Sequence, residues 1–584
     1  MYDRRDHASG ATQSGQRDTQ RVGFGLAQPV WPRAYAVALT TLLACGIALR
    51  CSSTVLSLWI DEAWVVNSAA SATLHDMFFF TGWVQTTPPG VLLLLRALHT
   101  LGGVGVDHLR WLPIACSVLT LLLFARLAAH LLSAGFVLLA CAVVALSPEV
   151  LWYGAQIKQY TFDMLAMTVS LLLGLAYIRA PSALRLRLWF AGYGLAIGVS
   201  FPAAFTLPVM VVVAGLNGRG HTWHARLRDV MPLAICAALA TAGIYLTFVR
   251  PNAGLDNLGA FWAQGFLSSS GYSPAFFLRK TLAVMLEFTH LDLVTPARAV
   301  AAVIGLMIGS AALWRLPGYR RAQRAGLVAL VCLPIINTLA ANLLGLYPLS
   351  EFRLVSFLVP CLVLLPTAAF ERITASGLAW LSPLHRRRAA FIFATAVALG
   401  AALHLTASAG LPFGVAQPQG AVFQWEGNMD MRPVVNYLRD VDTLARPVFV
   451  HAAYQQLFEV YTQQHRLQAP VLYGQSGWPC CIPGRAWRGA AFDGAEINRE
   501  VARLIGQFPP GPMYFVLVTH AFQPKRDAAH FYVEALAAHH CATTWRTNFG
   551  RIALLKAQCN EDPSATRARS SDGDQPQAVP LFSR

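Results

Sequence analysis

Long apolar runs, each of roughly membrane-spanning length, follow one another from residue 34 to residue 408 and are separated by short loops that carry arginine. A helix needs about 20 apolar residues to cross the hydrocarbon core of a bilayer. With 55% hydrophobic and only 13% charged residues, the chain is expected to be a multi-pass membrane protein. The net charge of +16 is spread over the loops instead of one face or tail, so membrane topology explains it and nucleic-acid binding is not predicted.

The arginines predict how the runs are oriented, because Lys and Arg concentrate in short cytoplasmic loops. Residues 1–33 are polar and carry five arginines, which indicates a disordered cytoplasmic leader before the first span. The loops near residues 179–187, 219–228, 315–324 and 372–388 are then cytoplasmic too. Single spans are expected at residues 34–56, 110–130, 134–152, 160–178, 229–249, 298–314, 325–346, 353–370 and 389–408.

Two apolar stretches do not fit single spans. Residues 188–216 lie between two cytoplasmic loops and must cross an even number of times, so Pro202 predicts a hairpin of short helices that turns near Phe201. Residues 88–103 are too short to span and predict an interfacial helix. The total is about eleven crossings, which places residues 410–560 outside the cytoplasm.

The sequence changes in kind after the last span, and residues 411–560 predict a small extracytoplasmic α/β domain. The expected elements are strands at 447–450 and 513–518 and helices near 430–440, 453–464 and 525–538. Cys541 and Cys559 flank a possible terminal strand pair that a disulfide could close, whereas the adjacent Cys480 and Cys481 would need separate partners or remain thiols. Residues 561–584 are polar and predict a disordered tail.

Asp61 and Glu62 follow the first span directly, so the predicted topology puts two adjacent carboxylates at the outer membrane surface. A charged group at the bilayer centre costs roughly 2.5–3.5 kcal/mol on insertion scales, so acidic residues beside a span are candidates for a function. The alternative is an interfacial cap, in which the carboxylates accept hydrogen bonds at the start of the next helix. The residues alone leave both interpretations open.

Two cations are expected on the same membrane face. Lys158 is one of only four lysines among 45 basic residues, and its ammonium can bind phosphate as a flexible point charge. Arg353 can bind a phosphate with two parallel hydrogen bonds. With the carboxylates, these cations suit a reaction in which a hydroxyl attacks and a lipid phosphate leaves. The alternative for each cation is an interfacial anchor or a salt bridge to Glu149 or Glu351.

The order of these motifs resembles the GT-C glycosyltransferases, which include protein O-mannosyltransferases, lipid A aminoarabinose transferases and lipopolysaccharide-core galacturonosyltransferases. The shared features are Asp-Glu after the first span, a Pro-Pro helix, Ser-Pro and then Lys-Gln-Tyr in the next outer loop, and Tyr-Pro and then Arg-Leu before a late span. The resemblance covers roughly residues 34–410. It implies a helical polytopic membrane fold, a polyprenyl-phosphate sugar donor, an extracytoplasmic envelope acceptor and an inverting transfer at the inner membrane.

Carried over residue by residue, the resemblance makes Asp61 the general base or the carboxylate that orients the acceptor, with Glu62 beside it. Lys158 stands where many relatives have arginine, which keeps a cation but loses the bidentate fork. The residues implied to bind the donor phosphate or substrate are Lys158, Tyr160, Asp163 and Arg353. No metal is predicted, because Asp61 and Glu62 are adjacent instead of spaced by one, and the next outer loop offers only Glu149 and Asp163.

Two other functions share some of these features. A polytopic transporter or flippase predicts charges within the spans, where this chain has few, with Arg50 and Asp163 lying near span ends. An envelope-glycan ligase or polymerase would use the same carboxylate and cation chemistry on a diphosphate-linked glycan. No HExxH, paired CxxC, P-loop or GxGxxG motif occurs, so zinc hydrolysis, nucleotide hydrolysis and dinucleotide chemistry lack support.

Overall fold

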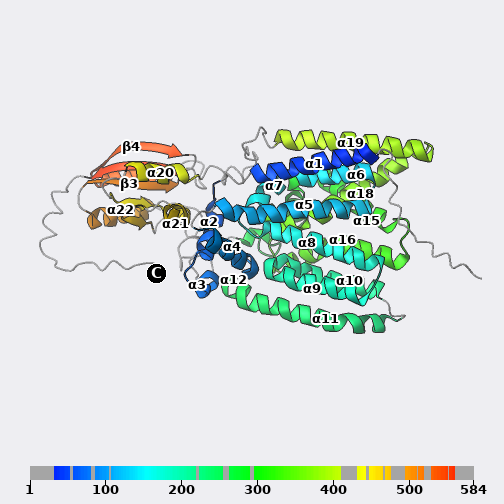
Figure 1. The fold of residues 1–584 in the computed structure, drawn as a ribbon. Coiled ribbons are helices and arrows are strands. Elements are labelled where there is room, and N and C mark those ends of the chain that lie inside the picture. The colour runs from blue at the N-terminus through cyan, green and yellow to red at the C-terminus, as the bar shows by residue number, and fades with distance from the viewer. Residues whose placement is uncertain are drawn as a thin grey trace, which may run out of the picture.

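The computed structural model consists of a helical bundle and a small α/β domain at one end of it (Figure 1). This arrangement confirms the predicted class, a helical polytopic membrane protein with an appended α/β domain. The residues that the structure describes are 32–52, 57–79, 86–103, 107–218, 222–253, 262–289, 295–408, 430–441, 446–464, 467, 469–474, 494–508, 511–518, 528–549 and 552–559.

Eight helices among the described residues are long and apolar enough to cross a membrane. They include, in chain order, α1 (Pro32–Ser52), α5 (Trp111–Leu131), α8 (Tyr160–Arg179), α11 (Trp223–Ile244), α15 (Pro296–Trp314), α16 (Arg321–Leu343), α18 (Val359–Gly377) and α19 (Pro383–Ser408). A ninth span results if α6 (Ala134–Leu146) and α7 (Pro148–Ala155), bent by 51° at Ser147, count as one. Each of the nine predicted single spans thus coincides with a helix or with this bent pair.

Residues 188–216, the apolar stretch that does not fit a single span, lie in two short helices after α8. α9 (Ala183–Val199) and α10 (Thr206–Asn217) are joined by the 3₁₀ turn η4 (Phe201–Phe205), which confirms the predicted break near Phe201. The helices have 17 and 12 residues, or roughly 25 and 18 Å, and the hydrocarbon core is about 30 Å thick. The total of eleven crossings therefore stays a prediction that depends on this hairpin.

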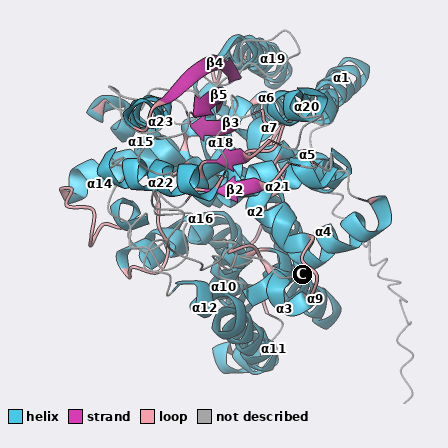
Figure 2. Ribbon diagram, turned by 90° about the vertical axis from the view of Figure 1, so that its left-hand side faces the viewer, coloured by secondary structure: helices cyan, strands magenta, loops and turns pink. Residues whose placement is uncertain are grey.

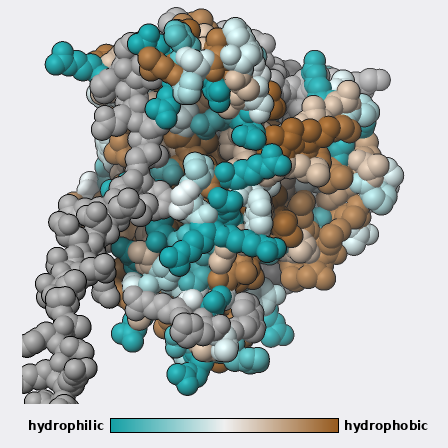
Figure 3. Space-filling view, turned by 90° about the vertical axis from the view of Figure 1, so that its right-hand side faces the viewer, coloured by the Kyte–Doolittle hydropathy of each residue, from teal (hydrophilic) through white to brown (hydrophobic). Residues whose placement is uncertain are grey.

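The basic loops gather at the end of the bundle that lies away from the α/β domain. Arg179, at the end of α8, donates to the Tyr319 hydroxyl at 3.1 Å and contacts His130 of α5. Arg226 at the start of α11 donates to the carbonyl of Leu216. Figure 3 views this end and shows hydrophilic side chains among hydrophobic ones. These contacts bring the basic loops that contain Arg179 and Tyr319 together, and the cytoplasmic orientation of the basic loops stays a prediction.

Short helices occupy the opposite end, next to the α/β domain. They are α2 (Ile60–Ala69), α3 (Leu74–Phe79), α4 (Pro89–Gly102), η3 (Asp107–Arg110), η5 (Tyr245–Val249), α12 (Arg250–Ala253), η6 (Ala263–Gly265), α14 (Pro274–Met285), η7 (Glu287–Thr289), α17 (Phe352–Val355) and η8 (Ser356–Leu358). α4 is the short helix expected after Pro88, and it packs against α2 and α9. Its Gly90 permits this packing, because a Cβ there would lie 2.7 Å from the carbonyl oxygen of Gly198.

The α/β domain contains a five-stranded sheet in the order β2-β1-β3-β5-β4 (Figure 2). β1 pairs in parallel with β2 and β3, whereas β5 is antiparallel to β3 and β4. The elements are α20 (Arg432–Val441), β1 (Val448–Val450), η10 (Ala452–Tyr454), α21 (Gln455–Gln464), β2 (Val471–Tyr473), α22 (Gly494–Gln507), β3 (Gly511–Val518), α23 (Ala528–Ala538), β4 (Cys541–Phe549) and β5 (Ile552–Cys559). The predicted elements are all present, and only β2 and α22 were not expected.

Cys541 and Cys559 stand opposite each other on β4 and β5 and form a disulfide, so the possible disulfide closing this strand pair is confirmed. Cys480 and Cys481 lie outside the described residues, as do residues 1–31 of the expected leader and the whole expected tail at 561–584. The expected boundary between residues 410 and 411 also falls outside them, so the domain limits stay predictions.

Candidate active site

Helix α2 carries the two adjacent carboxylates. It begins at Ile60 after an extended Trp59, so Asp61 and Glu62 both lie in its first turn, where the helix dipole favours negative charge. Successive residues of a helix point about 100° apart, and the two carboxylates therefore have different surroundings.

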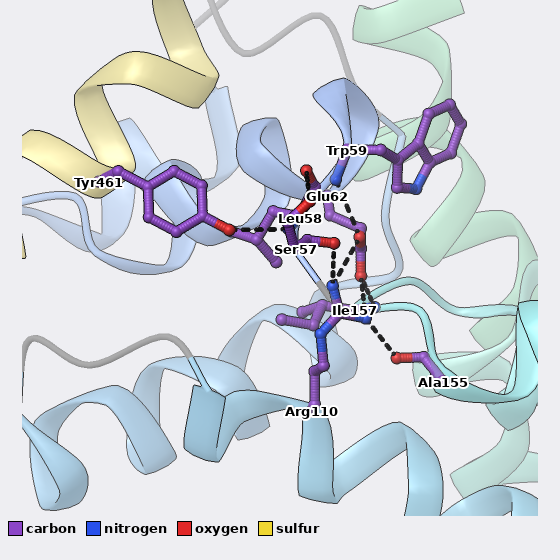
Figure 4. Close-up of polar contacts among 8 residues, drawn as sticks. All are labelled: Ser57, Leu58, Trp59, Glu62, Arg110, Ala155, Ile157 and Tyr461. Atoms are coloured by element: carbon purple, nitrogen blue, oxygen red, sulfur yellow. Dashed lines mark hydrogen bonds and ion pairs between the residues drawn. The ribbon is translucent and has the colours of Figure 1, made fainter. Parts of the chain in front are cut away.

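Glu62 is fully enclosed. Its Oε1 accepts a hydrogen bond from the backbone N–H of Ile157 at 2.7 Å, and its Oε2 accepts one from the N–H of Trp59 at 3.1 Å. The Arg110 guanidinium contacts both oxygens, at 3.0 and 3.1 Å (Figure 4). Each of the two charged side chains is only 2% exposed. The bond to Trp59 is the one expected of the capping alternative, so that alternative describes Glu62 well.

Arg110, which the sequence reasoning did not select, lies at the centre of this arrangement. Besides holding Glu62, it donates to the carbonyls of Ala155 at 2.9 Å and Ser57 at 2.8 Å. One guanidinium thereby joins three segments: the residues before α2, the end of η3 and the end of α7 (Figure 4). In the sequence, Arg110 looks like any basic residue that flanks a membrane span. Nothing near it in the sequence indicates that its partner is Glu62, 48 residues away.

Asp61 lies in a more open position and pairs with Arg353. The Arg353 Nη1 to Asp61 Oδ2 distance is 2.7 Å, and the Asp61 side chain is 21% exposed. Arg353 also forms an ion pair with Glu351, and its guanidinium lies over the rings of Trp59 and Trp262 at 5.4 and 5.3 Å from their centroids. The predicted alternative of an Arg353–Glu351 salt bridge is therefore correct, but it accounts for only part of the contacts of this arginine. Asp61 Oδ1 has no hydrogen-bond donor in the part of the chain that the structure describes.

Lys158 lies in the turn between α7 and α8, where its N–H bonds to the carbonyl of Gln156. Burial lowers the pKa of its ammonium to about 8; nearby Arg353 acts in the same direction, whereas Asp61 and Glu62 raise the pKa. The side chain is only 7% exposed, yet its ammonium has no hydrogen bond or ion pair to any residue in the described ranges. The expected alternative of a salt bridge to Glu149 is therefore wrong for the described structure. Lys158 is therefore a buried cation whose ammonium makes no hydrogen bond with the part of the chain that the structure describes.

Aromatic residues and one further acid border this group of charges. Tyr160 packs edge-on against Tyr153 with ring centroids 5.3 Å apart, and both interact electrostatically with Arg353. Asp163 lies within electrostatic range of Tyr347, and its Oδ1 has no partner among the residues described. Burial raises the pKa of the Tyr347 phenol well above its ordinary value, and its hydroxyl donates to a backbone carbonyl at 2.7 Å.

The structure therefore brings the six predicted site residues to one end of the bundle. Asp61, Lys158, Tyr160 and Arg353 interact with one another, Asp163 borders them through Tyr347, and Glu62 lies behind them in the Arg110 contact. The residues that sequence reasoning missed are Trp59, Arg110, Tyr153, Trp262 and Tyr347. Aromatic residues are abundant throughout this chain, so no sequence signal separates the four aromatic residues of this list from the others.

A group of three or more His, Cys, Asp and Glu side chains that could hold a metal ion does not occur among the described residues. Asp61 and Glu62, the adjacent acids of α2, instead take Arg353 and Arg110 as their partners. Independence from metal stays a prediction.

No family model matches this sequence, and no curated protein matches it. Solved structures do match. ArnT from Cupriavidus metallidurans bound to undecaprenyl phosphate has a TM-score of 0.51 at 14% identity, over 88% of this chain and 97% of that one. The same ArnT in the apo state has a TM-score of 0.50 at 14% identity, over 90% and 98%. An oligosaccharyltransferase from Archaeoglobus fulgidus has a TM-score of 0.48 at 12% identity, over 82% and 68%.

The chain thus has the fold of the GT-C superfamily, as the order of its motifs predicted. It is a multi-pass membrane protein whose likeness to ArnT extends over nearly the whole length of that protein.

Proposed function

We propose that this protein is an integral membrane glycosyltransferase that moves a sugar from a polyprenyl-phosphate donor to an envelope acceptor outside the cytoplasm. The observation that carries the proposal is the convergence at one end of a GT-C bundle of Asp61, Arg353 and the Lys158 ammonium, which has no partner among the described residues. One ArnT structure with this fold is bound to undecaprenyl phosphate, a lipid of the class that we assign to the donor.

In the proposed reaction, the acceptor nucleophile attacks the anomeric carbon of the sugar from the side opposite the phosphate, which inverts the configuration. Asp61 accepts the proton of the nucleophile through Oδ1, which has no donor among the described residues. The bond between the anomeric carbon and the phosphate oxygen breaks, and its electron pair leaves with the polyprenyl phosphate. Lys158 and Arg353 stabilise the negative charge that develops there.

Arg353 must exchange partners for this to occur. Without donor it contacts Asp61 and Glu351, and a bound phosphate would compete for the same guanidinium. Phosphate binding would thus free Asp61 from its ion pair at the moment when a base is needed. Lys158 needs no such exchange, because its ammonium has no partner within the described residues.

The other predicted residues receive more limited roles. We assign Glu62 to positioning, since its four contacts leave neither oxygen available and fix the turn that carries Asp61. Tyr160 would line the phosphate subsite beside Arg353, and Asp163 would contact the sugar or acceptor, because its Oδ1 lacks a partner in the described part of the chain.

The proposed orientation places the site outside the cytoplasm at the inner membrane. The basic loops lie at the opposite end of the bundle from the site, and such loops concentrate on the cytoplasmic side. The disulfide between Cys541 and Cys559 supports the same orientation, because disulfides persist in oxidising compartments.

An envelope-glycan ligase or polymerase is the second candidate, since a diphosphate-linked donor would engage the same two cations. A transporter or flippase is less well supported. Arg50, the buried charge of α1, is occupied by Ser117 and the carbonyls of Gly46, Val144 and Ala145, and so is not available to a moving substrate.

The test is sugar transfer in proteoliposomes that contain the purified protein, membranes from a deletion strain as acceptor, and radiolabelled undecaprenyl-phosphate mannose, aminoarabinose or galacturonate. Asp61→Asn keeps the shape of the side chain but removes the base, so transfer should fall by roughly 10²–10⁴-fold. Asp76→Asn, which changes an exposed carboxylate of α3 in the same loop, is the matched control and should retain activity. Transfer by Asp61→Asn at more than a tenth of the wild-type rate would refute the assignment, and transfer only from a diphosphate-linked glycan would favour the ligase.

A further inference from the structure

The α/β domain is packed directly against the helix that carries Asp61. α2 and α21 make extensive contact, and one continuous apolar cluster includes Ala63 and Val66 of α2 and Leu457 and Phe458 of α21. All four side chains are at most 3% exposed. The domain therefore forms one wall of the core that surrounds α2.

Tyr461 of α21 reaches the start of α2. Its hydroxyl accepts a hydrogen bond of 2.8 Å from the backbone N–H of Leu58, across 403 residues of sequence (Figure 4). Leu58 precedes Trp59, whose own N–H is bound by Glu62. Two consecutive N–H groups before α2 are thus held by side chains of two different domains, and Asp61 follows them by two residues.

A second contact holds the other half of the same helix. Asn67 Nδ2 donates to the side-chain oxygen of Gln456 at 2.7 Å and to its carbonyl at 3.0 Å. Both residues are buried. Arg96 of α4 meanwhile donates to the carbonyl of Ser71 at 2.6 Å, beyond the end of α2. The helix is therefore fixed along its length, and two of its contacts come from the α/β domain.

We propose that Tyr461 is a positioning residue for Asp61, through which the α/β domain holds the catalytic carboxylate in register with Arg353 and the bound donor. The proposal rests on the proposed function. The N–H of Leu58 lies before the helix and has no carbonyl partner within it, so the Tyr461 hydroxyl is the group that holds this N–H, beside the contacts that Glu62 makes in the same turn. A shift of about 1 Å between reacting groups can cost a factor of 10² in rate, so the turn needs to be held.

The chemistry of Tyr461 suits a fixed, neutral hydrogen-bond acceptor. Burial raises the pKa of its phenol to about 12, although the N–H of Leu58 and the nearby Arg432 and Arg110 oppose the shift. Tyr461 therefore stays uncharged at any physiological pH, and its contribution to the turn does not change with pH.

The test compares Tyr461→Phe with the full-length wild type in proteoliposomes. Phenylalanine keeps the ring in the apolar cluster and removes only the hydroxyl, so the protein should fold. We expect kcat for sugar transfer to fall roughly 10- to 100-fold. The Kd for undecaprenyl phosphate should change less than twofold, because Lys158 and Arg353 are untouched. Tyr473→Phe makes the same chemical change on β2, away from α2, and should leave kcat unchanged.

A double-mutant cycle separates positioning from a general loss of structure. Asp61→Glu moves the carboxylate by about one bond, so its register with Arg353 and the bound donor is already lost. Adding Tyr461→Phe to this variant should then reduce its kcat by less than threefold. A purely structural role would instead multiply the two effects and lower the yield of folded protein. An unchanged kcat in Tyr461→Phe, or a matching loss of affinity for undecaprenyl phosphate, would overturn the inference. If the wild-type protein itself transfers no sugar from any polyprenyl-phosphate donor, the proposed function fails. That outcome differs from failure of the Tyr461 proposal, in which the wild type is active and Tyr461→Phe is equally active.

Discussion

Two arginine–carboxylate pairs lie one residue apart on α2, and they differ in almost every other respect. Arg110 and Glu62 are each 2% exposed, and backbone groups engage the remaining positions of both. Asp61, paired with Arg353, is 21% exposed. Among the described residues, one of its oxygens has no donor, and the nearby Lys158 ammonium has no partner.

The difference shows how the surroundings of a charge decide its use. A buried pair whose hydrogen bonds are all satisfied cannot exchange partners without a large loss of free energy, so it serves as structure. A pair that is open on one side, with an excess cation beside it, can accept a new anion. The two neighbouring carboxylates thus have different surroundings, which is why we propose different roles for them.

The largest expected effect is on stability and concerns the closed pair, Arg110 and Glu62. Arg110→Met leaves Glu62 buried without its partner, which should destabilise the folded protein by about 3–5 kcal/mol. Thermal unfolding in detergent measures this loss. The double variant Arg110→Met/Glu62→Leu removes both charges and should recover most of the stability. If Arg110→Met unfolds at the wild-type temperature, the closed pair has no structural role.

A substitution in the open pair, Asp61 and Arg353, should change the affinity for the donor lipid and leave the stability of the protein nearly unchanged. Arg353→Met removes a charged donor to phosphate, worth about 1.5–3 kcal/mol, so the Kd for undecaprenyl phosphate should rise roughly 10- to 100-fold. Calorimetry with the solubilised protein measures it, and the unfolding temperature should change little. Glu351→Gln keeps the arginine and removes a competing carboxylate, so its Kd should stay the same or fall, opposite in direction to Arg353→Met. An unchanged affinity in Arg353→Met would show that this arginine does not contact the phosphate.

The smallest effect is a dependence of donor affinity on pH. Lys158 has a pKa near 8, so its ammonium is charged below pH 8 and neutral above it. Undecaprenyl phosphate keeps its charge over this range because its second pKa is about 6. Its Kd should therefore rise about tenfold between pH 7 and pH 9. Lys158→Arg should remove this dependence, since guanidinium stays charged; an equally steep rise in that variant would assign the titration to another group.

Much of the fold follows from local sequence. Apolar runs and basic loops are properties of contiguous residues, so each single span was located with ends up to about seven residues off, and the break near Phe201 was predicted as well. The disulfide between Cys541 and Cys559 was a possibility that the sequence left open. β2 has only three residues and no alternation strong enough to predict it.

The site was predicted only in part, because partner choice is not local. Asp61, Lys158 and Arg353 could be selected as rare charges on one membrane face. Nothing in the sequence indicated that Glu62 would turn toward Arg110, since that depends on how η3 packs beside α2. Tyr461 was missed for the same reason: its partner is 403 residues away.

The position of β5 in the sheet bears on when the α/β domain can fold during synthesis. β5 follows every other strand in the sequence, yet it lies between β3 and β4. On the proposed orientation, the ribosome must translate and the membrane must translocate this last strand before the sheet can close. Because α21 belongs to the same domain and rests on α2, the support that this domain gives to α2 would be complete only after β5 has been synthesised.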